Sequence, residues 1–339
     1  METIAITNIP RKILIIKPSS LGDVVHSLPF LSALNERFPF AKIHWVIAKG
    51  IEGILEGNPL VSKLWIIDKD KWKKVGRIAG TIFELGRLAH DIKAEDYDIA
   101  IDLQGLMRSG LITKATGAPM RIGFTEAREG SVIFYTHKVA GGKDVHAVDR
   151  YLKVVQALGG DIKEVRFPMP LIREPEEMGR LKSDIGDYAV ITAGARWETK
   201  KWPAGQYAAL AAMLDIKSVV VGSAADRGVA KVIAEQSRGK ALSMAGETDI
   251  LELIWLIRGA KLMITNDSGP MHIAAACGIP VVALFGPTNP NRTGPYGRNN
   301  VIIRSAVQCA PCYKKRCKDL RCMKEISVEQ VYEAVREIL

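Results

Sequence analysis

The chain has 339 residues, of which 47% are hydrophobic and 25% charged, a balance typical of a globular protein with more than one core. No run of 18 apolar residues occurs, which excludes a membrane-spanning helix, and the N-terminus lacks the features of a secretory signal. We therefore expect a cytoplasmic protein. The formal net charge of +10 favours anionic partners: a nucleotide, a phosphorylated substrate, an acidic membrane surface or a nucleic acid.

A buried parallel strand is predicted at residues 12–16, because KILII is a near-continuous apolar run. The segment KPSSLGDVVHSLP follows, without the glycine fingerprint of a dinucleotide-binding fold. It places Asp23 at the start of the next helix, and the loop after the first strand of an open α/β sheet lies where ligands bind. Asp23 is therefore a helix cap, a base acting on a ligand, or both.

Strand and helix patterns continue to alternate through the first half of the chain. Strands are predicted at residues 43–47, 64–67 and 99–103, and the last is followed by Gln104 and Arg108. Further donors suited to carboxylates or phosphates are Arg121, Arg128, His146 and Arg150. This half therefore predicts an α/β domain with polar groups at its strand ends.

A basic run occupies residues 69–77, KDKWKKVGR, and precedes apolar residues at helical spacing. Two interpretations are open: a solvated lysine face, which is the commoner one, or contact with an anionic membrane surface. The run is our candidate for membrane contact.

An extended linker is predicted at residues 167–175, which are rich in proline. The α/β rhythm then restarts with a strand at residues 189–192, followed by a turn of small residues, Gly194 and Ala195, and by Lys200. The next strand ends before Asp226. This predicts a second domain of the nucleotide-binding type.

The clearest unit of this second domain spans residues 261–290. A buried strand leads into Asp267, Ser268 and Gly269, and Pro270 fits the first turn of the following helix. Helix N-termini present unpaired N–H groups and a positive dipole end, which bind phosphate. With Lys200 opposite, such a terminus can hold a diphosphate without a metal. The alternative is an ordinary capped helix.

Four of the five cysteines lie together in CAPCYKKRCKDLRC, at positions 309, 312, 317 and 322. Such a cluster can hold zinc or an iron–sulfur centre, or it can consist of reduced thiols in a surface loop. The spacing after Cys312 matches no standard metal motif. We therefore expect no metal.

Five segments in order, ILIIKPSSLGDVVHSLP, DLQGLMRSG, KKWP, NDSGPMHIAAACGIPVVALFGPTNP and the cysteine run, resemble those of glycosyltransferase family 9, the lipopolysaccharide heptosyltransferases. The pieces EARE, FY and HAVDR resemble the heptosyltransferase I branch. The likeness implies an α/β fold of GT-B type, with two Rossmann-like doubly wound domains facing across a cleft. They would be residues 1–170, which bind the acceptor, and 176–326, which bind the nucleotide sugar; residues 327–339 would form a closing C-terminal helix.

The resemblance also implies a reaction and its partners. L-glycero-D-manno-heptose would pass from ADP-heptose to a Kdo residue of the lipid A inner core, with inversion and without a cofactor. The enzyme would work peripherally at the cytoplasmic face of the inner membrane. Two alternatives are open: a family-9 enzyme with another nucleotide sugar or acceptor, and a non-catalytic binder of nucleotides or nucleic acid. Aromatic residues, at 6%, are too few for the stacking platforms of single-strand binders, so we expect no nucleic-acid partner.

Site residues follow from the residues and the resemblance together. Asp23 is expected to be the general base, and Lys200 with the amides at residues 268–271 to neutralise the diphosphate. The further donor-side residues are Asp267 (sugar hydroxyls), Ser268, Gly269, Pro270, His272, Gly194, Ala195, Asp226 (ribose) and Thr248 (near adenine). The acceptor-side residues are Lys17, Ser20, Gly22, Gln104, Arg108, Arg128 and His146. Gly194 and Ala195 replace paired threonines of the family, so only backbone contacts are expected there.

Overall fold

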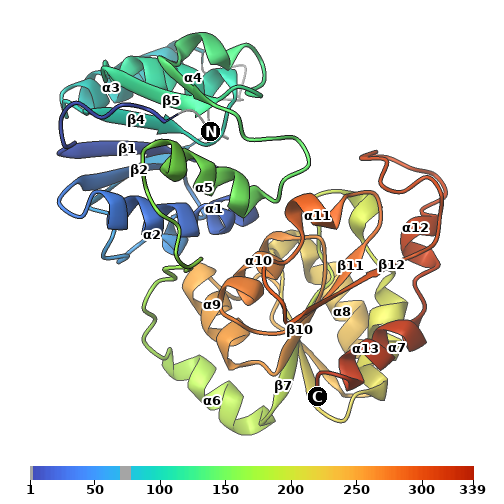
Figure 1. Cartoon of the computed structure of the whole chain (residues 1–339). Helices are drawn as coiled ribbons and strands as arrows, with labels where there is room; N and C mark the ends of the chain where they lie inside the picture. Colours follow the sequence, from blue (N-terminus) through green and yellow to red (C-terminus); the bar gives the residue numbers. More distant parts are fainter. Residues whose placement is uncertain (1–2, 69–77) are drawn as a thin grey trace. The chain divides into compact units, whose positions relative to one another are not determined.

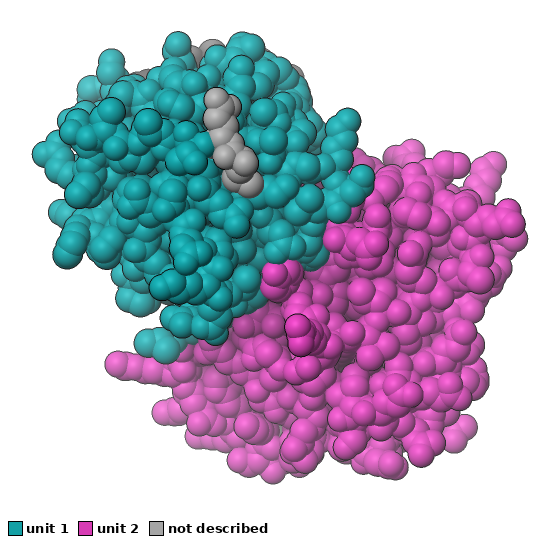
Figure 2. Space-filling view, viewed as in Figure 1, with its two compact units in different colours: residues 1–171 teal, residues 172–339 magenta. Residues whose placement is uncertain are grey.

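The computed structural model describes residues 3–68 and 78–339 of the chain. They belong to two compact units, Met1–Leu171 and Ile172–Leu339, coloured separately in Figure 2. The basic run at residues 69–77, our candidate for membrane contact, lies outside the described residues. No helix within the described ranges has the length and apolar character that crossing a membrane requires.

Unit 1 is built on one sheet of six parallel strands in the order β3-β2-β1-β4-β5-β6 (Figure 1). The strands are β1 (Lys12–Ile16), β2 (Lys42–Ala48), β3 (Lys63–Ile67), β4 (Ile99–Asp102), β5 (Met120–Phe124) and β6 (His137–Val139). The α-helices are α1 (Leu21–His26), α2 (Leu28–Arg37), α3 (Ile78–Lys93), α4 (Met107–Ala115) and α5 (Ala147–Ala157). Helices α3 and α4 cover one face of the sheet, and α1, α2 and α5 the other.

The central strands of this sheet are buried on both faces, since helices cover both. Residues 13–16 of β1 are completely buried, which explains why the sequence of this strand is an unbroken apolar run. Strand order reverses between β1 and β4, whose neighbouring ends pair Ile16 with Asp102. In a doubly wound sheet this reversal is where ligands bind, so β1 and β4 position the candidate site.

Unit 2 repeats this architecture with a second parallel sheet, in the order β12-β11-β10-β7-β8-β9. The strands are β7 (Tyr188–Thr192), β8 (Lys217–Val220), β9 (Ala241–Ser243), β10 (Leu262–Asn266), β11 (Val281–Phe285) and β12 (Asn300–Arg304). The α-helices are α6 (Glu176–Ile185), α7 (Ala204–Met213), α8 (Arg227–Gln236), α9 (Ile250–Gly259), α10 (Gly269–Ala276), α11 (Pro290–Thr293), α12 (Arg321–Lys324) and α13 (Val328–Arg336). The predicted pair of Rossmann-like doubly wound sheets is confirmed.

The last helix, α13, packs into the core of unit 2 beside α7. Its N-cap Ser327 accepts a hydrogen bond from the Gln330 backbone N–H, and its Val331 and Val335 are buried. The indole of Trp202 donates to the Ile326 carbonyl at 2.9 Å, which ties this end of the chain to the turn that carries Lys200.

Acid should weaken unit 1 through Glu95, whose carboxylate joins the starts of β1 and β3. Lys63 and Lys12 donate to it at 2.6 and 2.9 Å, and these bonds lower the pKa of Glu95 from near 4.5 to about 2. A depressed carboxyl pKa stabilises the fold above the unfolded value, and this stability is lost as pH falls from about 4.5 towards 2. We expect Glu95→Gln to unfold at lower temperature at pH 7 and to show a smaller loss over that range.

The matched control for this prediction is Glu164→Gln, because Glu164 pairs with Arg166 where both side chains are 63% exposed. Exposed pairs add little stability, so its pH profile should follow that of the native protein. Thermal unfolding followed by circular dichroism from pH 2 to 7 makes the comparison. An unchanged acid dependence in Glu95→Gln would contradict the assignment.

Candidate functional site

Asp23 lies in the first turn of α1, directly after the loop that ends β1. Its Oδ2 accepts hydrogen bonds from the backbone N–H and the hydroxyl of Ser20, at 2.9 and 2.7 Å. Its Oδ1 lies 3.9 Å from the Lys17 ammonium, and the side chain is 38% exposed. Asp23 thus caps its helix through one oxygen while the carboxylate stays open to solvent, so the structural and chemical roles are compatible.

Lys17 is a buried cation beneath this carboxylate, only 3% exposed. Its ammonium lies 5.2 Å from the centre of the Tyr151 ring and donates to the Leu103 carbonyl at 3.4 Å. Burial by itself lowers the pKa of Lys17, but Asp23 and Tyr151 outweigh it and leave the pKa raised. The loop therefore holds a fixed positive charge next to Asp23.

A pair of histidines borders the same loop. His26, at the end of α1, and His146, the N-cap of α5, meet edge to face with ring centres 5.0 Å apart. Nδ1 of His146 accepts from the Val148 backbone N–H at 3.2 Å, so this expected acceptor-side residue also caps a helix. His26 was missed by sequence reasoning, although it lies one turn after Asp23 on the same helix.

Gln104 follows β4 and is positioned by the buried Asp102. Oδ1 of Asp102 accepts from the backbone N–H groups of Gln104 and Gly105, and Oδ2 from the hydroxyls of Ser109 and Tyr135. Burial raises the pKa of Asp102, although these bonds oppose it. Oε1 of Gln104 is buried without a hydrogen-bond partner. Because buried polar atoms are normally satisfied, this amide is suited to contact a ligand.

Arg108, Arg121, Arg128 and Arg150, the four arginines of unit 1 that we selected from the sequence, have different surroundings. Arg108, in the first turn of α4, and Arg128, whose backbone N–H donates to Gly105, both have exposed side chains. Arg121 donates to the carbonyls of Phe134 and Ala118, and Arg150 lies 3.7 Å from Glu126. Arg108 and Arg128 are therefore the available anion donors, whereas Arg121 and Arg150 already have partners within unit 1.

In unit 2, Lys200 pairs with Asp267. Nζ of Lys200 lies 2.6 Å from Oδ2 of Asp267, which also accepts from the Thr288 hydroxyl at 2.6 Å. The two charged side chains are 16% and 7% exposed. The Lys200 ammonium also lies 4.7 Å from the centre of the Trp197 ring. The sequence placed Lys200 and Asp267 at strand ends but did not predict that they pair; Thr288, three residues after β11, was missed.

The N-terminus of α10 adjoins this pair. Ser268 is its N-cap, but its hydroxyl bonds to Thr265 at 3.0 Å and makes no cap bond to the helix. Gly269 opens the helix and Pro270, which has no N–H, follows. His272 is buried in this first turn. The terminus keeps the positive dipole end and the uncapped amides that suit an anion.

Gly194, two residues after β7, lies against the carboxylate of Asp226, the N-cap of α8. A Cβ built at Gly194 would lie only 2.5 Å from Oδ1 of Asp226. That carboxylate is fixed in turn, because its Oδ2 accepts from the backbone N–H and hydroxyl of Ser223. A threonine at position 194 therefore does not fit this chain, which explains one departure from the family pattern.

We expect Gly194→Ala to displace Asp226 and to lower the free energy of unfolding by about 1–2 kcal/mol, the usual cost of a lost cap. Urea unfolding measures it. Gly205→Ala is the matched control, since its Cβ would meet nothing closer than 3.9 Å, and alanine in a helix is neutral or stabilising. Equal stability of Gly194→Ala and the native chain would show that Asp226 is not confined by Gly194.

Asn266, the last residue of β10, belongs to the segment from which the sequence predicts turn and cap chemistry, but it was not among the predicted site residues. Its Oδ1 accepts from the Trp202 backbone N–H and the Tyr207 hydroxyl, and its Nδ2 donates to the Ala193 carbonyl at 2.7 Å. It thereby joins the end of β7 to the turn that carries Lys200. The sequence signal was its place at a strand end, beside the Asp267 that we did select.

Thr248 and the cysteine run lie on other loops of unit 2. Thr248 is half-buried just before Asp249, the N-cap of α9. The run passes beside the Lys200 turn, where the Thr199 hydroxyl donates to the Lys314 carbonyl at 2.8 Å. All five thiols are free, and among the described residues no three His, Cys, Asp or Glu side chains are arranged to hold a metal ion.

Comparison with known proteins gives one consistent family. The profile of Glycosyltransferase family 9 (heptosyltransferase) matches residues 85–322. The Lipopolysaccharide heptosyltransferase 1 of Pseudomonas aeruginosa is 33% identical over 90% of this chain and 87% of its own length. The protein of the same name from Escherichia coli K12 is 28% identical over 87% of this chain and 93% of its own length.

Solved structures agree with this assignment. A glycosyl transferase family 9 protein from Veillonella parvula superposes with a TM-score of 0.83 and 28% identity, covering 97% of both chains. E. coli heptosyltransferase WaaC with ADP gives a TM-score of 0.80 and 25% identity, over 97% of this chain and all of that one. The likeness confirms the predicted GT-B fold class.

Proposed function

This chain belongs to glycosyltransferase family 9, the heptosyltransferases, and from that premise we propose that it moves L-glycero-D-manno-heptose from ADP-heptose to a Kdo residue of the lipopolysaccharide inner core. The observation that carries the proposal is Asp23, a solvent-open carboxylate beside a buried ammonium where β1 and β4 end. Such a group suits a base that acts on a hydroxyl bound at the sheet edge.

Inversion in one step needs two things at the anomeric carbon. The acceptor hydroxyl attacks from the face opposite the leaving group and loses its proton to Asp23, while the bond to the ADP oxygen breaks. The departing diphosphate carries the developing negative charge, so its stabilisation is the second need. We assign this to Lys200 and the backbone N–H groups of Ser268, Gly269 and Met271 at the start of α10. No metal ion takes part in this proposal.

Donor binding is assigned to strand ends of unit 2. Lys200 is paired with Asp267 in this structure, so the diphosphate would take over part of the lysine, and Asp267 would turn to hydroxyls of the heptose. Asp226 is assigned to the ribose hydroxyls, with backbone contacts from Gly194 and Ala195 nearby. Thr248 is assigned to the surroundings of the adenine. The buried setting of Lys200 and Asp267 supports a strong interaction with a bound anion.

Acceptor binding is assigned to unit 1, around Asp23. The unsatisfied Gln104 amide suits a sugar hydroxyl, and the exposed Arg108 and Arg128 suit the carboxylate or phosphates of the acceptor. Lys17, Ser20, Gly22 and His146 shape the β1–α1 side of the same edge. Because this acceptor is anchored in lipid, the enzyme would work peripherally at the cytoplasmic face of the inner membrane.

Transfer from ADP-heptose to Kdo-lipid A, measured in the presence of EDTA, tests the proposal. Native protein should transfer heptose under these conditions, and the product should show inverted configuration. A panel of other nucleotide sugars and of acceptors without Kdo is run in parallel. Turnover of another donor, with none of ADP-heptose, would refute the substrate assignment and leave the family unchanged.

A further inference from the structure

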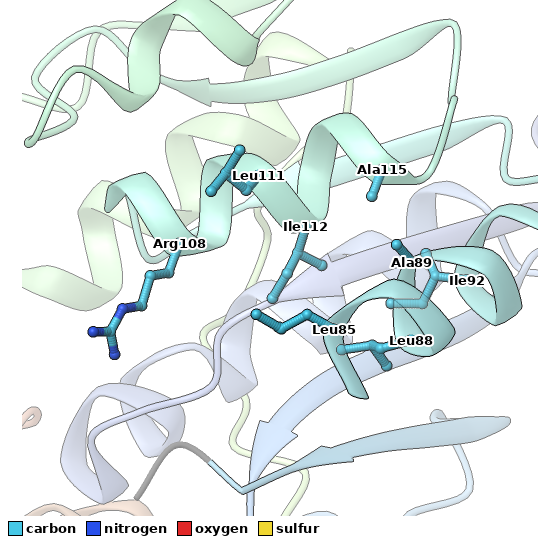
Figure 3. Close-up of a pocket in the computed structure, with 8 residues that line it drawn as sticks. All are labelled: Leu85, Leu88, Ala89, Ile92, Arg108, Leu111, Ile112 and Ala115. Carbon is cyan, nitrogen blue, oxygen red and sulfur yellow. The ribbon is translucent and has the colours of Figure 1, made fainter. Parts of the chain in front are cut away.

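A cavity of about 380 Å³ lies between α3 and α4, on the face of the unit 1 sheet away from α1 (Figure 3). Of the described residues, four of α3 and four of α4 line it, and seven of these eight are apolar. Its volume is within the range of pockets that hold small ligands, about 300–1,000 Å³. We call this cavity the α3–α4 groove.

The floor and the rim of the groove differ in exposure. Ile92 and Ile112, on its floor, are buried in the core of unit 1. Leu85 and Leu111, which also line it, are 37% and 52% exposed. The groove therefore presents apolar surface to solvent, and exposed apolar surface in a concave site marks a place where an apolar partner binds.

Among the described residues that line the groove, Arg108 alone is charged, and it defines the polarity of the groove. It lies in the first turn of α4, while the apolar residues follow along the helix to Ala115. Its side chain is exposed, and no ion pair to its guanidinium exists within the described part of the chain. The groove is thus apolar along its length and cationic at one end, which fits a single-chain anionic amphiphile better than a neutral or cationic one.

The cationic end is also the end nearest the proposed acceptor site. Helix α4 begins at Met107, directly after the loop of Gln104 and Gly105, whose backbone N–H groups Asp102 fixes. A lipid whose anionic group meets Arg108 would therefore place its polar part at the strand ends and its chain between the helices. We propose that the α3–α4 groove holds one acyl chain of the enzyme's own lipid acceptor, with an anionic group of that acceptor at Arg108; the identity of this lipid rests on the proposed function.

Binding of simple alkyl phosphates tests the groove without reference to catalysis. Octyl, decyl and dodecyl phosphate are titrated by calorimetry below their micellar concentrations. We expect the affinity to rise about two- to fourfold per methylene, as partial to complete burial of each one predicts. Dodecyl trimethylammonium should bind at least tenfold more weakly. Affinity that does not depend on chain length would overturn the proposal.

Three variants locate the binding. Leu111→Ser changes a rim position that tolerates polarity, and Ala115→Phe fills the groove. Each should weaken the binding of dodecyl phosphate at least fivefold. Arg108→Gln should remove the preference for the anionic head. The matched control is Leu242→Ser in unit 2, a leucine that is 40% exposed and lies outside the groove, which should bind as the native chain does. Native affinity in both Leu111→Ser and Ala115→Phe would exclude the groove.

Kinetics with two acceptors identify the occupant. Leu111→Ser should raise KM at least fivefold for acylated Kdo-lipid A and leave KM unchanged for the fully deacylated acceptor. Equal effects on both would refute the acceptor's chain as occupant, even if alkyl phosphates bind. If native protein transfers heptose to neither acceptor, the proposed function fails. The titrations still show whether the groove binds an anionic amphiphile. Absence of alkyl phosphate binding together with dimerisation lost in Leu111→Ser would assign the groove to a second copy and overturn the proposal.

Discussion

Asp23→Asn is expected to lower kcat for heptose transfer by about 10²–10⁴, the usual contribution of a positioned general base. Asparagine keeps an oxygen that can accept from the Ser20 backbone N–H and hydroxyl, so the helix cap survives. The variant should therefore keep the cap and lose only the charge that faces the buried Lys17, so its melting temperature should fall less than that of Asp23→Ala. A large loss of rate with the cap retained indicates that Asp23 acts as a base and not only as a cap. Transfer kinetics at saturating donor and acceptor, with thermal unfolding in parallel, measure both.

Two further variants separate the roles of Asp23. Asp23→Ala loses the cap as well and should cost about 1 kcal/mol of stability besides the rate. Glu252→Ala is its matched control, because Glu252 accepts from the Asp249 backbone N–H at 2.8 Å in the equivalent capping box of α9. It should lose a similar stability and keep full activity. If Asp23→Asn retained more than a tenth of the native kcat, Asp23 would not be the base.

Lys200→Met is expected to lower kcat/KM for ADP-heptose by about 10²–10³, since it removes the charge that we propose stabilises the leaving diphosphate. It should also destabilise unit 2 by about 3 kcal/mol, because breaking a buried ion pair leaves the other charge without compensation. Asp267 would keep only the Thr288 hydroxyl among the contacts described above. Urea unfolding and initial-rate kinetics give the two quantities.

A double-mutant cycle with Asp267→Asn then separates the effect of Lys200 on stability from its effect on activity. In Lys200→Met with Asp267→Asn the uncompensated charge is gone, so most of the lost stability should return, whereas activity should not. Lys201→Met is the control, since Lys201 pairs with Glu198, whose side chain is 77% exposed, and such pairs contribute little. Recovery of activity in the double variant would show that Lys200 serves only to neutralise Asp267.

The sequence predicted those parts of the site that depend on strand ends. Apolar runs identify buried parallel strands, and the polar residues that follow them lie at the carboxyl edge of their own sheet. Asp23 lies at this edge in unit 1, and Lys200 and Ser268 lie at it in unit 2. The two doubly wound sheets were predictable for this reason. Four strands were not identified. Strands β6 and β9 have three residues each, and so short a segment carries little periodicity. Strands β5 and β12 have five residues each, but they are less apolar than the central strands.

What the sequence could not predict is which side chains meet. The pairing of Lys200 with Asp267 joins residues 67 positions apart, and the contact of His26 with His146 joins two helices. The sequence shows Gly194 only as the loss of a threonine, whereas the structure places it against the carboxylate of Asp226, the N-cap of α8. Such contacts follow from the packing of the folded chain, which no local pattern encodes. The α3–α4 groove is of the same kind, since its two walls come from separate helices.

Asn266 has a consequence for the thermodynamics of donor binding. One buried side chain holds the Ala193 carbonyl, the Trp202 N–H and the Tyr207 hydroxyl together, so the turn that carries Lys200 is fixed before any nucleotide arrives. A turn that is already ordered loses little conformational entropy on binding. A larger share of the free energy of each contact with the donor therefore contributes to the binding affinity. The conformational entropy of this turn is lost when the chain folds, so donor binding does not have to order it.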